Sequence, residues 1–144
     1  MTEILTRDLV LVPGAARTRE DAIREAGDLL VAAGAVGPAY VDAMVEREAS
    51  VSTYMGNGLA IPHGTNAAKG EIRRTAMSLV RYDDPIDWGG GPAQVVVGIA
   101  GTGDEHLEIL GRLAVLFSDA DQARQVVDAP DADAVLALLA SVNT

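Results

Sequence analysis

The chain has 144 residues, 49% of them hydrophobic, and its formal net charge at pH 7 is -10. A chain of this length can bury one hydrophobic core without help from disulfides or metals. The sequence has no cysteine, which excludes disulfides, thiolate nucleophiles and cysteine-based metal centres. Any chemistry must therefore come from histidine, carboxylate, hydroxyl or backbone groups.

The charge also restricts the classes of partner. With 11 Lys and Arg residues against 21 Asp and Glu, the chain is not expected to bind nucleic acid or an anionic membrane surface. No leader of charged and then apolar residues and no run of about 18 apolar residues occurs, so we expect a cytoplasmic protein without membrane insertion. The acidic surface fits a basic protein partner and also fits solubility alone.

The first third of the chain predicts an edge strand and two helices. Residues 9–12 (LVLV) precede a Pro-Gly turn signal and predict a short strand near the edge of a sheet. Thr18 resembles a helix N-cap, and apolar residues recur at helical spacing from there to Gly34. A second helix is expected to open at Pro38 and to end at residues 46–48 (ERE).

The middle of the chain predicts strands separated by glycine-rich turns. Residues 59–61 (LAI) and 76–80 (AMSLV) are apolar runs of strand length, and residues 83–85 (DDP) are expected to end the second run. Residues 88–92 (WGGGP) predict a surface loop; no P-loop lysine or helix start follows, which argues against a phosphate cradle there. Residues 94–100 (QVVVGIA) predict a central strand that is buried on both faces.

The last third of the chain predicts three helices. Apolar residues repeat at three- and four-residue spacing over residues 107–117, and shorter helices are expected over residues 121–127 and after residues 130–131 (PD). No repeat, low-complexity tract or linker interrupts the sequence. We therefore expect a single α/β domain over residues 1–144, with a mixed sheet of about four to five strands flanked by helices on both faces.

The two histidines are the candidate functional residues. His63 lies between Pro62 and Gly64, just after the strand expected at residues 59–61, and His106 lies in the first turn of a later helix. Open α/β sheets place their sites where strands end and the following helices begin. The alternative for His63 alone is a loop histidine without a function.

Three kinds of chemistry can use this pair of histidines. A metal site needs a third ligand; Asp104 and Glu105 are available, but no H-x-x-x-H spacing occurs. A serine hydrolase needs a nucleophile on a tight turn, and no G-x-S-x-G occurs. A histidine that itself carries a phosphoryl group fits better, because neutral imidazole is a competent nucleophile and a good leaving group.

A phosphorylated histidine needs groups that balance negative charge. The helix start at residues 104–107 could face a phosphate through its free N–H groups. The same field favours a neutral His106, whereas Asp104 and Glu105 oppose that effect, and the sequence leaves the balance open. Arg47 could supply a fixed positive charge. The alternative for Arg47 is an ordinary solvated arginine paired with its neighbours.

Four segments carry a resemblance to a known family: residues 46–48 (ERE), 53–65 (TYMGNGLAIPHGT), 97–100 (VGIA) and 105–110 (EHLEIL). They resemble the enzyme IIA domain of the mannitol/fructose class of the bacterial sugar phosphotransferase system. The resemblance extends over nearly the whole chain and implies a mixed β-sheet flanked by helices. Residues 36–48 look most like the mannitol branch of this class. Residues 55–58 (MGNG) and the glycines after Trp88 do not match a feature of the mannitol branch.

The resemblance also implies a role for each candidate residue. His63 matches the phosphorylated histidine, a tele-phosphohistidine intermediate, His106 matches the histidine that supports the phosphoryl group by a hydrogen bond, and Arg47 matches the arginine that stabilises charge. The phosphoryl donor is then the phosphocarrier protein HPr. The acceptor is enzyme IIB or an IICB permease component, for uptake and phosphorylation of mannitol. No cofactor and no metal is implied.

Transfer between two proteins predicts an apolar, exposed rim around His63 and a small, transient interface. Met55 is a candidate for this rim, whereas Leu59 and Ile61 are expected to belong to the core. The alternative function is regulatory: a protein resembling the nitrogen-related enzyme IIA proteins, whose phosphorylation controls binding to other proteins. A relative of this fold that has lost phosphotransfer is a further alternative.

Overall fold

A five-stranded mixed β-sheet forms the centre of the computed structural model, which describes residues 4–140 and 142. In spatial order its strands are β1 (Val10–Leu11), β4 (Ala76–Asp87), β5 (Pro92–Ala100), β3 (Leu59–Ala60) and β2 (Tyr54–Gly56). β1 runs parallel to β4 and β3 parallel to β5, whereas β4 with β5 and β2 with β3 are antiparallel. The expected mixed sheet of four to five strands is confirmed, with β1 at an edge and β5 in the middle.

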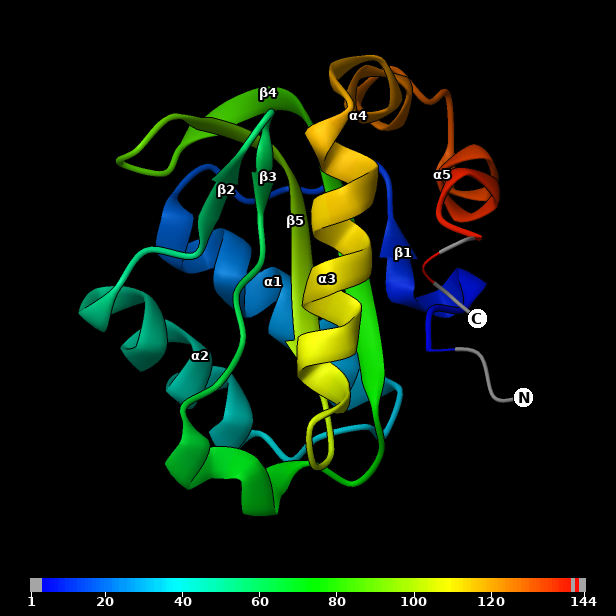
Figure 1. Cartoon of the computed structure of the whole chain (residues 1–144). Coiled ribbons are helices and arrows are strands. Elements are labelled where there is room, and N and C mark those ends of the chain that lie inside the picture. Colours follow the sequence, from blue (N-terminus) through cyan, green and yellow to red (C-terminus); the bar gives the residue numbers. More distant parts are fainter. Residues whose placement is uncertain (1–3, 141, 143–144) are drawn as a thin grey trace.

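Helices lie on both faces of this sheet, as expected (Figure 1). The helices are α1 (Arg19–Ala32), α2 (Ala39–Ser50), α3 (Glu105–Ser118), α4 (Ala120–Val127) and α5 (Ala132–Leu138), with short 3-10 helices η1 (Arg7–Leu9) and η2 (Asn66–Glu71). Figure 1 shows α1 behind the sheet and α3 in front of β5. α2 packs on α1, α4 contacts α3 and β5, and α5 contacts β1. In the part of the chain that the structure describes, no helix is both long and apolar enough to cross a membrane.

Local sequence signals explain most of these boundaries. α1 begins where the Thr18 hydroxyl accepts a hydrogen bond from the Asp21 N–H at 3.2 Å, and such a cap contributes about 1 kcal/mol. Ala33 follows its last residue, and Gly34 adopts φ +75°, a conformation that favours glycine. α2 continues to Ser50, two residues past the expected end at residues 46–48.

The central strand is buried as the sequence predicts. All residues from Val95 to Ala100 are buried, with α1 on one side of the strand and α3 and α4 on the other. A side chain such as Ile99 contributes roughly 1.5–3 kcal/mol when it is removed from water. This rigid strand carries the segment that leads into α3.

Two predictions about the β4–β5 hairpin are wrong. β4 does not end at residues 83–85 but continues to Asp87, with a shift in register between Arg81 and Ile86. The irregularity lets Pro85 lie in an exposed strand segment without removing a hydrogen bond that the ladder needs. Trp88, expected on a surface loop, is completely buried, and the exposed turn begins with Gly89 and Gly90 after it.

β2 was not predicted from the sequence. Tyr54–Gly56 is a three-residue strand at the sheet edge, with an irregular register opposite β3. Gly56 and Gly58 adopt φ +93° and +82°, and Asn57 between them adopts φ +51°. These residues form the tight turn that connects β2 with β3.

Candidate active site

Parallel pairing of β3 and β5 brings the two histidine segments to the same edge of the sheet. Leu59 lies opposite Val95 in this pairing. Beyond the end of β3, His63 forms a parallel bridge with Ile99, whose N–H donates to the Pro62 carbonyl at 3.0 Å. β5 ends at Ala100, and α3 begins five residues later. The ends of parallel strands therefore meet here, as sites in open α/β sheets require.

A cavity of about 290 Å³ lies at this edge. The residues that line it come from α2, the segment after β3, η2 and the start of α3: Tyr40, Arg47, His63, Gly64, Thr65, Lys69, Ile72, Gly101 and His106. All three candidates from the sequence, His63, His106 and Arg47, are in this set. The structure thus brings together residues that are up to 59 positions apart in the chain.

The backbone selects one tautomer of His63. Its Nδ1 lies 2.9 Å from the carbonyl oxygen of Ile61, and a carbonyl can only accept, so Nδ1–H is the donor. In the neutral ring the lone pair is then on Nε2. Burial is the largest cause and lowers the pKa of His63 below its usual 6.5; the Ile61 carbonyl and the Glu48 carboxylate oppose this shift, and the Arg47 charge and the His106 ring lower the pKa further. These causes favour a neutral, nucleophilic ring near neutral pH.

Tyr40 fixes the turn that carries His63, and the sequence did not single it out. Its buried hydroxyl donates to the Ile99 carbonyl at 2.7 Å and accepts from the Gly64 N–H at 2.9 Å. A Cβ at position 64 would lie 2.5 Å from the Tyr40 ring, so only glycine fits. Burial raises the pKa of Tyr40 above its usual 10.0, which keeps the hydroxyl protonated as a donor. In sequence, Tyr40 looks like one more residue of a buried helix stripe.

Two cations line the cavity from different elements. Half-buried Arg47 lies in the last turn of α2, and its Nη1 donates to the Val51 carbonyl at 2.7 Å. Lys69 of η2 donates from Nζ to the Gly103 carbonyl at 3.0 Å. Neither forms an ion pair with any of the residues described. Lys69 was not predicted, because a lysine in a polar connection looks like any solvated lysine.

His106 closes the cavity from the first turn of α3. Its Nδ1 is buried and has no hydrogen-bond partner among residues 4–140 and 142. Gly101 permits this close packing, since a Cβ there would lie 2.4 Å from the backbone nitrogen of His106. The histidine therefore retains a polar group that is not committed to the protein.

The site is suited to a small anion and to a nucleophilic imidazole. In the described part of the chain, no group of three or more His, Cys, Asp or Glu residues could hold a metal ion. The cavity instead combines a neutral imidazole, two cations and the start of a helix. Such groups stabilise the charge of a phosphoryl group in transfer.

Comparison with known proteins decides the family. The family model described as "Phosphoenolpyruvate-dependent sugar phosphotransferase system, EIIA 2" matches residues 3–142. The chain belongs to this family. The resemblance drawn from residues 46–48, 53–65, 97–100 and 105–110 is therefore confirmed, and a phosphotransferase activity follows from membership of the EIIA 2 family.

Individual members of the EIIA 2 family are similar over almost the full chain. The mannitol-specific phosphotransferase enzyme IIA component of Halalkalibacterium halodurans is 48% identical over 140 residues, which is 97% of each chain. The solved complex of enzyme IIAMtl and phosphorylated enzyme IIBMtl from Escherichia coli matches with a TM-score of 0.88 and 34% identity, over 94% and 96% of the two chains. The nitrogen regulatory protein IIA-Ntr from Neisseria meningitidis matches with a TM-score of 0.82 and 26% identity.

Proposed function

We propose that this protein is a cytoplasmic phosphocarrier for mannitol uptake, formed by one enzyme IIA domain over residues 1–144. It accepts a phosphoryl group from phospho-HPr on His63 and passes it to enzyme IIB or an IICB permease component. The similarity to mannitol-specific enzyme IIA components supports the sugar, and the E. coli complex with phosphorylated enzyme IIBMtl supports the acceptor. The observation that carries the proposal is the contact of His63 Nδ1 with the Ile61 carbonyl, which leaves the Nε2 lone pair of the neutral ring free at a cavity lined by cations.

The transfer step conserves charge and needs no proton to leave. Nε2 of neutral His63 attacks the phosphorus, the nitrogen–phosphorus bond of the HPr phosphohistidine breaks, and a new Nε2–phosphorus bond forms. The His63 ring then carries the positive charge, and its Nδ1–H keeps the hydrogen bond to the Ile61 carbonyl. Nε2 is the tele nitrogen, so this tautomer accounts for a tele-phosphohistidine. Transfer to enzyme IIB breaks the same bond.

The other residues of the cavity balance the charge of the phosphoryl group. Arg47 makes one hydrogen bond to the backbone, which leaves further guanidinium donors for phosphoryl oxygens. His106 donates a hydrogen bond to the phosphoryl group from the first turn of α3. Lys69 adds a second positive charge to the lining of the cavity.

Exposed apolar side chains near the site form the proposed docking rim. Leu107, which follows His106, is 57% exposed, Met55 of β2 is 47% exposed, and Val51 after α2 is 63% exposed. Leu59 and Ile61 are buried, as the sequence predicted. Leu107 is next to His106 in the chain and the Val51 carbonyl binds Arg47, so exposed apolar groups adjoin two cavity residues and suit a transient contact with two successive proteins.

The direct test is phosphorylation with phosphoenolpyruvate, enzyme I and HPr, comparing the wild type with His63→Ala. We expect acid-labile label on the wild type alone, and a phosphorus NMR signal typical of Nε2 phosphorylation. Equal label on both proteins would remove His63 as the acceptor. Onward transfer to a mannitol enzyme IIB and to a fructose enzyme IIB then tests the sugar, and transfer to neither would favour the regulatory alternative.

A further inference from the structure

Glu48 is a buried carboxylate directly beside Arg47 that the transfer step does not use. It is 5% exposed and lies on the last turns of α2. Its Oε2 accepts from the Thr53 N–H at 3.0 Å, and its Oε1 accepts from the Thr53 hydroxyl and from Trp88 Nε1 at 3.2 Å. Burying a carboxylate is costly unless donors surround it, and three donors do so here.

Hydrogen bonds connect this carboxylate to His63. The Thr53 carbonyl accepts from the Ile61 N–H at 3.1 Å, and the Ile61 carbonyl accepts from His63 Nδ1 at 2.9 Å. Thr53 therefore transmits the position of Glu48 to the carbonyl that selects the His63 tautomer. If Thr53 moves, Ile61 loses the backbone hydrogen bond that fixes its N–H, and the position of its carbonyl is less well defined.

The same short segment also holds Arg47. Residues 51–53 connect α2 with β2, and the carbonyl of Val51 accepts from Arg47 Nη1 at 2.7 Å. Glu48 binds the other end of this segment through Thr53. One buried carboxylate thus supports two of the groups that meet at the cavity.

We propose that Glu48 is a positioning residue for phosphoryl transfer, which fixes residues 51–53 and thereby the orientation of Arg47 and the tautomer of His63. This inference rests on the proposed role of His63 as phosphoryl acceptor. Catalytic groups must lie close to the productive geometry, and a displacement of about 1 Å costs about a hundredfold in rate.

A purely structural role makes a different prediction. Trp88 lies at the β4–β5 turn, so Glu48 also joins α2 to that hairpin. If this were its whole contribution, a change at Glu48 would lower the free energy of unfolding without altering His63. The ring tautomer of His63 and the transfer rate of folded protein separate these two roles.

The test uses Glu48→Gln, with Glu46→Gln as the matched control. The glutamine amide has nearly the same shape as the Glu48 carboxylate. Its NH2 group can only donate, so it opposes the donor of Trp88 Nε1–H or of the Thr53 N–H and one of these hydrogen bonds is lost. Glu46 lies on the same helix, is exposed, and accepts no hydrogen bond from the described residues through its side chain. Both variants remove one negative charge beside Arg47; because the Glu48 charge also raises the pKa of His63, the two are compared above pH 6.5, where this ring is neutral in both.

Two measurements are made on protein shown to be folded by circular dichroism. For Glu48→Gln we expect transfer from phospho-HPr to slow by ~10- to ~100-fold. Nitrogen NMR of the His63 ring should show a smaller fraction of the Nδ1–H tautomer. The control should stay within about twofold of the wild type, as expected for a surface change. Equal rates and equal tautomer fractions in the two variants would overturn the proposal.

Thr53 provides a second test that keeps Glu48 in place. Thr53→Val removes the hydroxyl at nearly the same volume and should slow transfer about threefold, while Thr53→Ser restores the hydroxyl and most of the rate. Equal slowing by both variants would contradict the relay through Thr53, and this comparison holds if Glu48→Gln does not fold. The NMR measurement is made on unphosphorylated protein, so its result does not depend on phosphoryl transfer. A wild type that accepts no label from phospho-HPr would contradict the proposed function. An unchanged His63 tautomer in Glu48→Gln would contradict this inference.

Discussion

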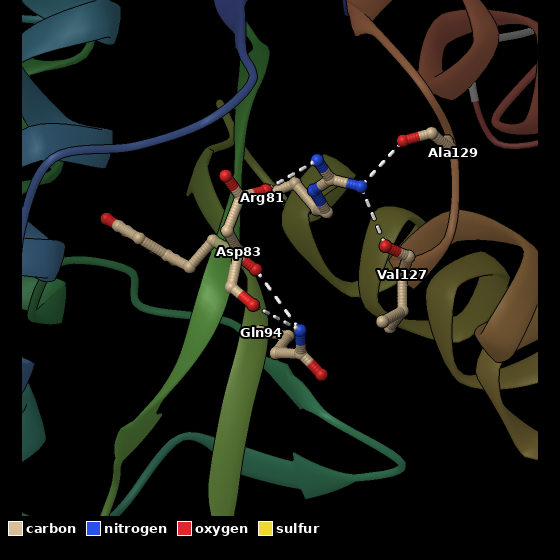
Figure 2. Close-up of polar contacts among 6 residues, drawn as sticks. Arg81, Asp83, Gln94, Val127 and Ala129 are labelled. Carbon is tan, nitrogen blue, oxygen red and sulfur yellow. Dashed lines mark hydrogen bonds and ion pairs between the residues drawn. The ribbon is translucent and has the colours of Figure 1, made fainter.

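Two arginines at different ends of the molecule show how the fold assigns opposite tasks to one kind of side chain. Arg81 of β4 is 8% exposed, and its Nη1 donates to the carbonyls of Val127 and Ala129 at 2.7 and 2.6 Å (Figure 2). Its Nη2 lies 3.0 Å from Asp83. Arg47 is half-buried, lines the cavity and donates to a single carbonyl.

The difference lies in how many donors each guanidinium has already committed. Arg81 ties the end of α4 to the sheet, where carbonyls without helical partners and the helix dipole both favour a cation. Gln94 reinforces the same region, because its Nε2 donates to the Asp83 carbonyl at 3.4 Å (Figure 2). A committed arginine stabilises the fold, whereas one with spare donors on a cavity is available to an anion.

Of the variants considered, removal of Arg47 should have the largest effect on the rate of phosphoryl transfer. For Arg47→Ala we expect phosphoryl transfer to slow by ~10²- to ~10³-fold, because charge that develops in transfer loses a preorganised donor. Urea unfolding should change little, since the side chain makes one hydrogen bond. Single-turnover labelling from phospho-HPr measures the rate. A rate within a few-fold of the wild type would show that Lys69 alone balances the charge.

Removing Arg81 should lower the stability of the protein and leave the transfer rate unchanged, which is the opposite of the effect expected for Arg47. Arg81→Met leaves the buried carbonyls of Val127 and Ala129 without their donor, so we expect the free energy of unfolding to fall by roughly 2–4 kcal/mol. Urea denaturation provides the measurement. The transfer rate of the fraction that remains folded should match the wild type. A large loss of rate in stably folded Arg81→Met would mean that the two regions are coupled and that the comparison fails.

A variant of His106 tests its buried Nδ1, which has no partner among the described residues. In His106→Gln we expect label to arrive from HPr but onward transfer to enzyme IIB to slow by ~10- to ~100-fold, the value of one hydrogen bond to a charged group. A chase of labelled protein with enzyme IIB follows this step. Unchanged onward transfer would exclude His106 from the mechanism, and the unpaired Nδ1 would then be only a cost of packing α3 against Gly101.

A change of pH should have the smallest effect on the rate of phosphoryl transfer. Because burial and the Arg47 charge lower the pKa of His63 below its usual 6.5, the ring stays neutral below pH 6.5 and transfer should decline only as pH falls through the lower folded value. The unfolded chain binds this proton first, so stability also falls as pH drops from 6.5 to the folded pKa.

Two variants sharpen this pH profile. Arg47→Ala should move the inflection in the transfer rate to higher pH, because one of the charges that lower the pKa of His63 is gone. Arg81→Met should leave the inflection where it is in the wild type. The His63 ring nitrogens, titrated by NMR, report the same shift without any transfer. An identical inflection in wild type and Arg47→Ala would show that the Arg47 charge does not contribute to the low pKa of His63.

Local patterns in the sequence were sufficient for most elements of the fold. The cap at Thr18 and the apolar periodicity up to Gly34 are set by neighbours within a few residues, and the structure places α1 there. The prediction of a central buried strand at residues 94–100 is confirmed, and it was possible because both faces of this strand are apolar. The motifs around His63 and His106 carried the family, which the comparison confirmed.

Tertiary structure decided how the site is assembled and which further residues belong to it. Parallel pairing of β3 with β5 places His63 beside the start of α3, and no local pattern records which strands pair. Tyr40, Lys69 and buried Glu48 look ordinary in sequence, because their importance depends on partners such as Gly64, which is 24 positions from Tyr40. The sequence by itself determined which groups can do chemistry. The tertiary hydrogen bond from His63 Nδ1 to the Ile61 carbonyl decided which ring nitrogen is free to do it.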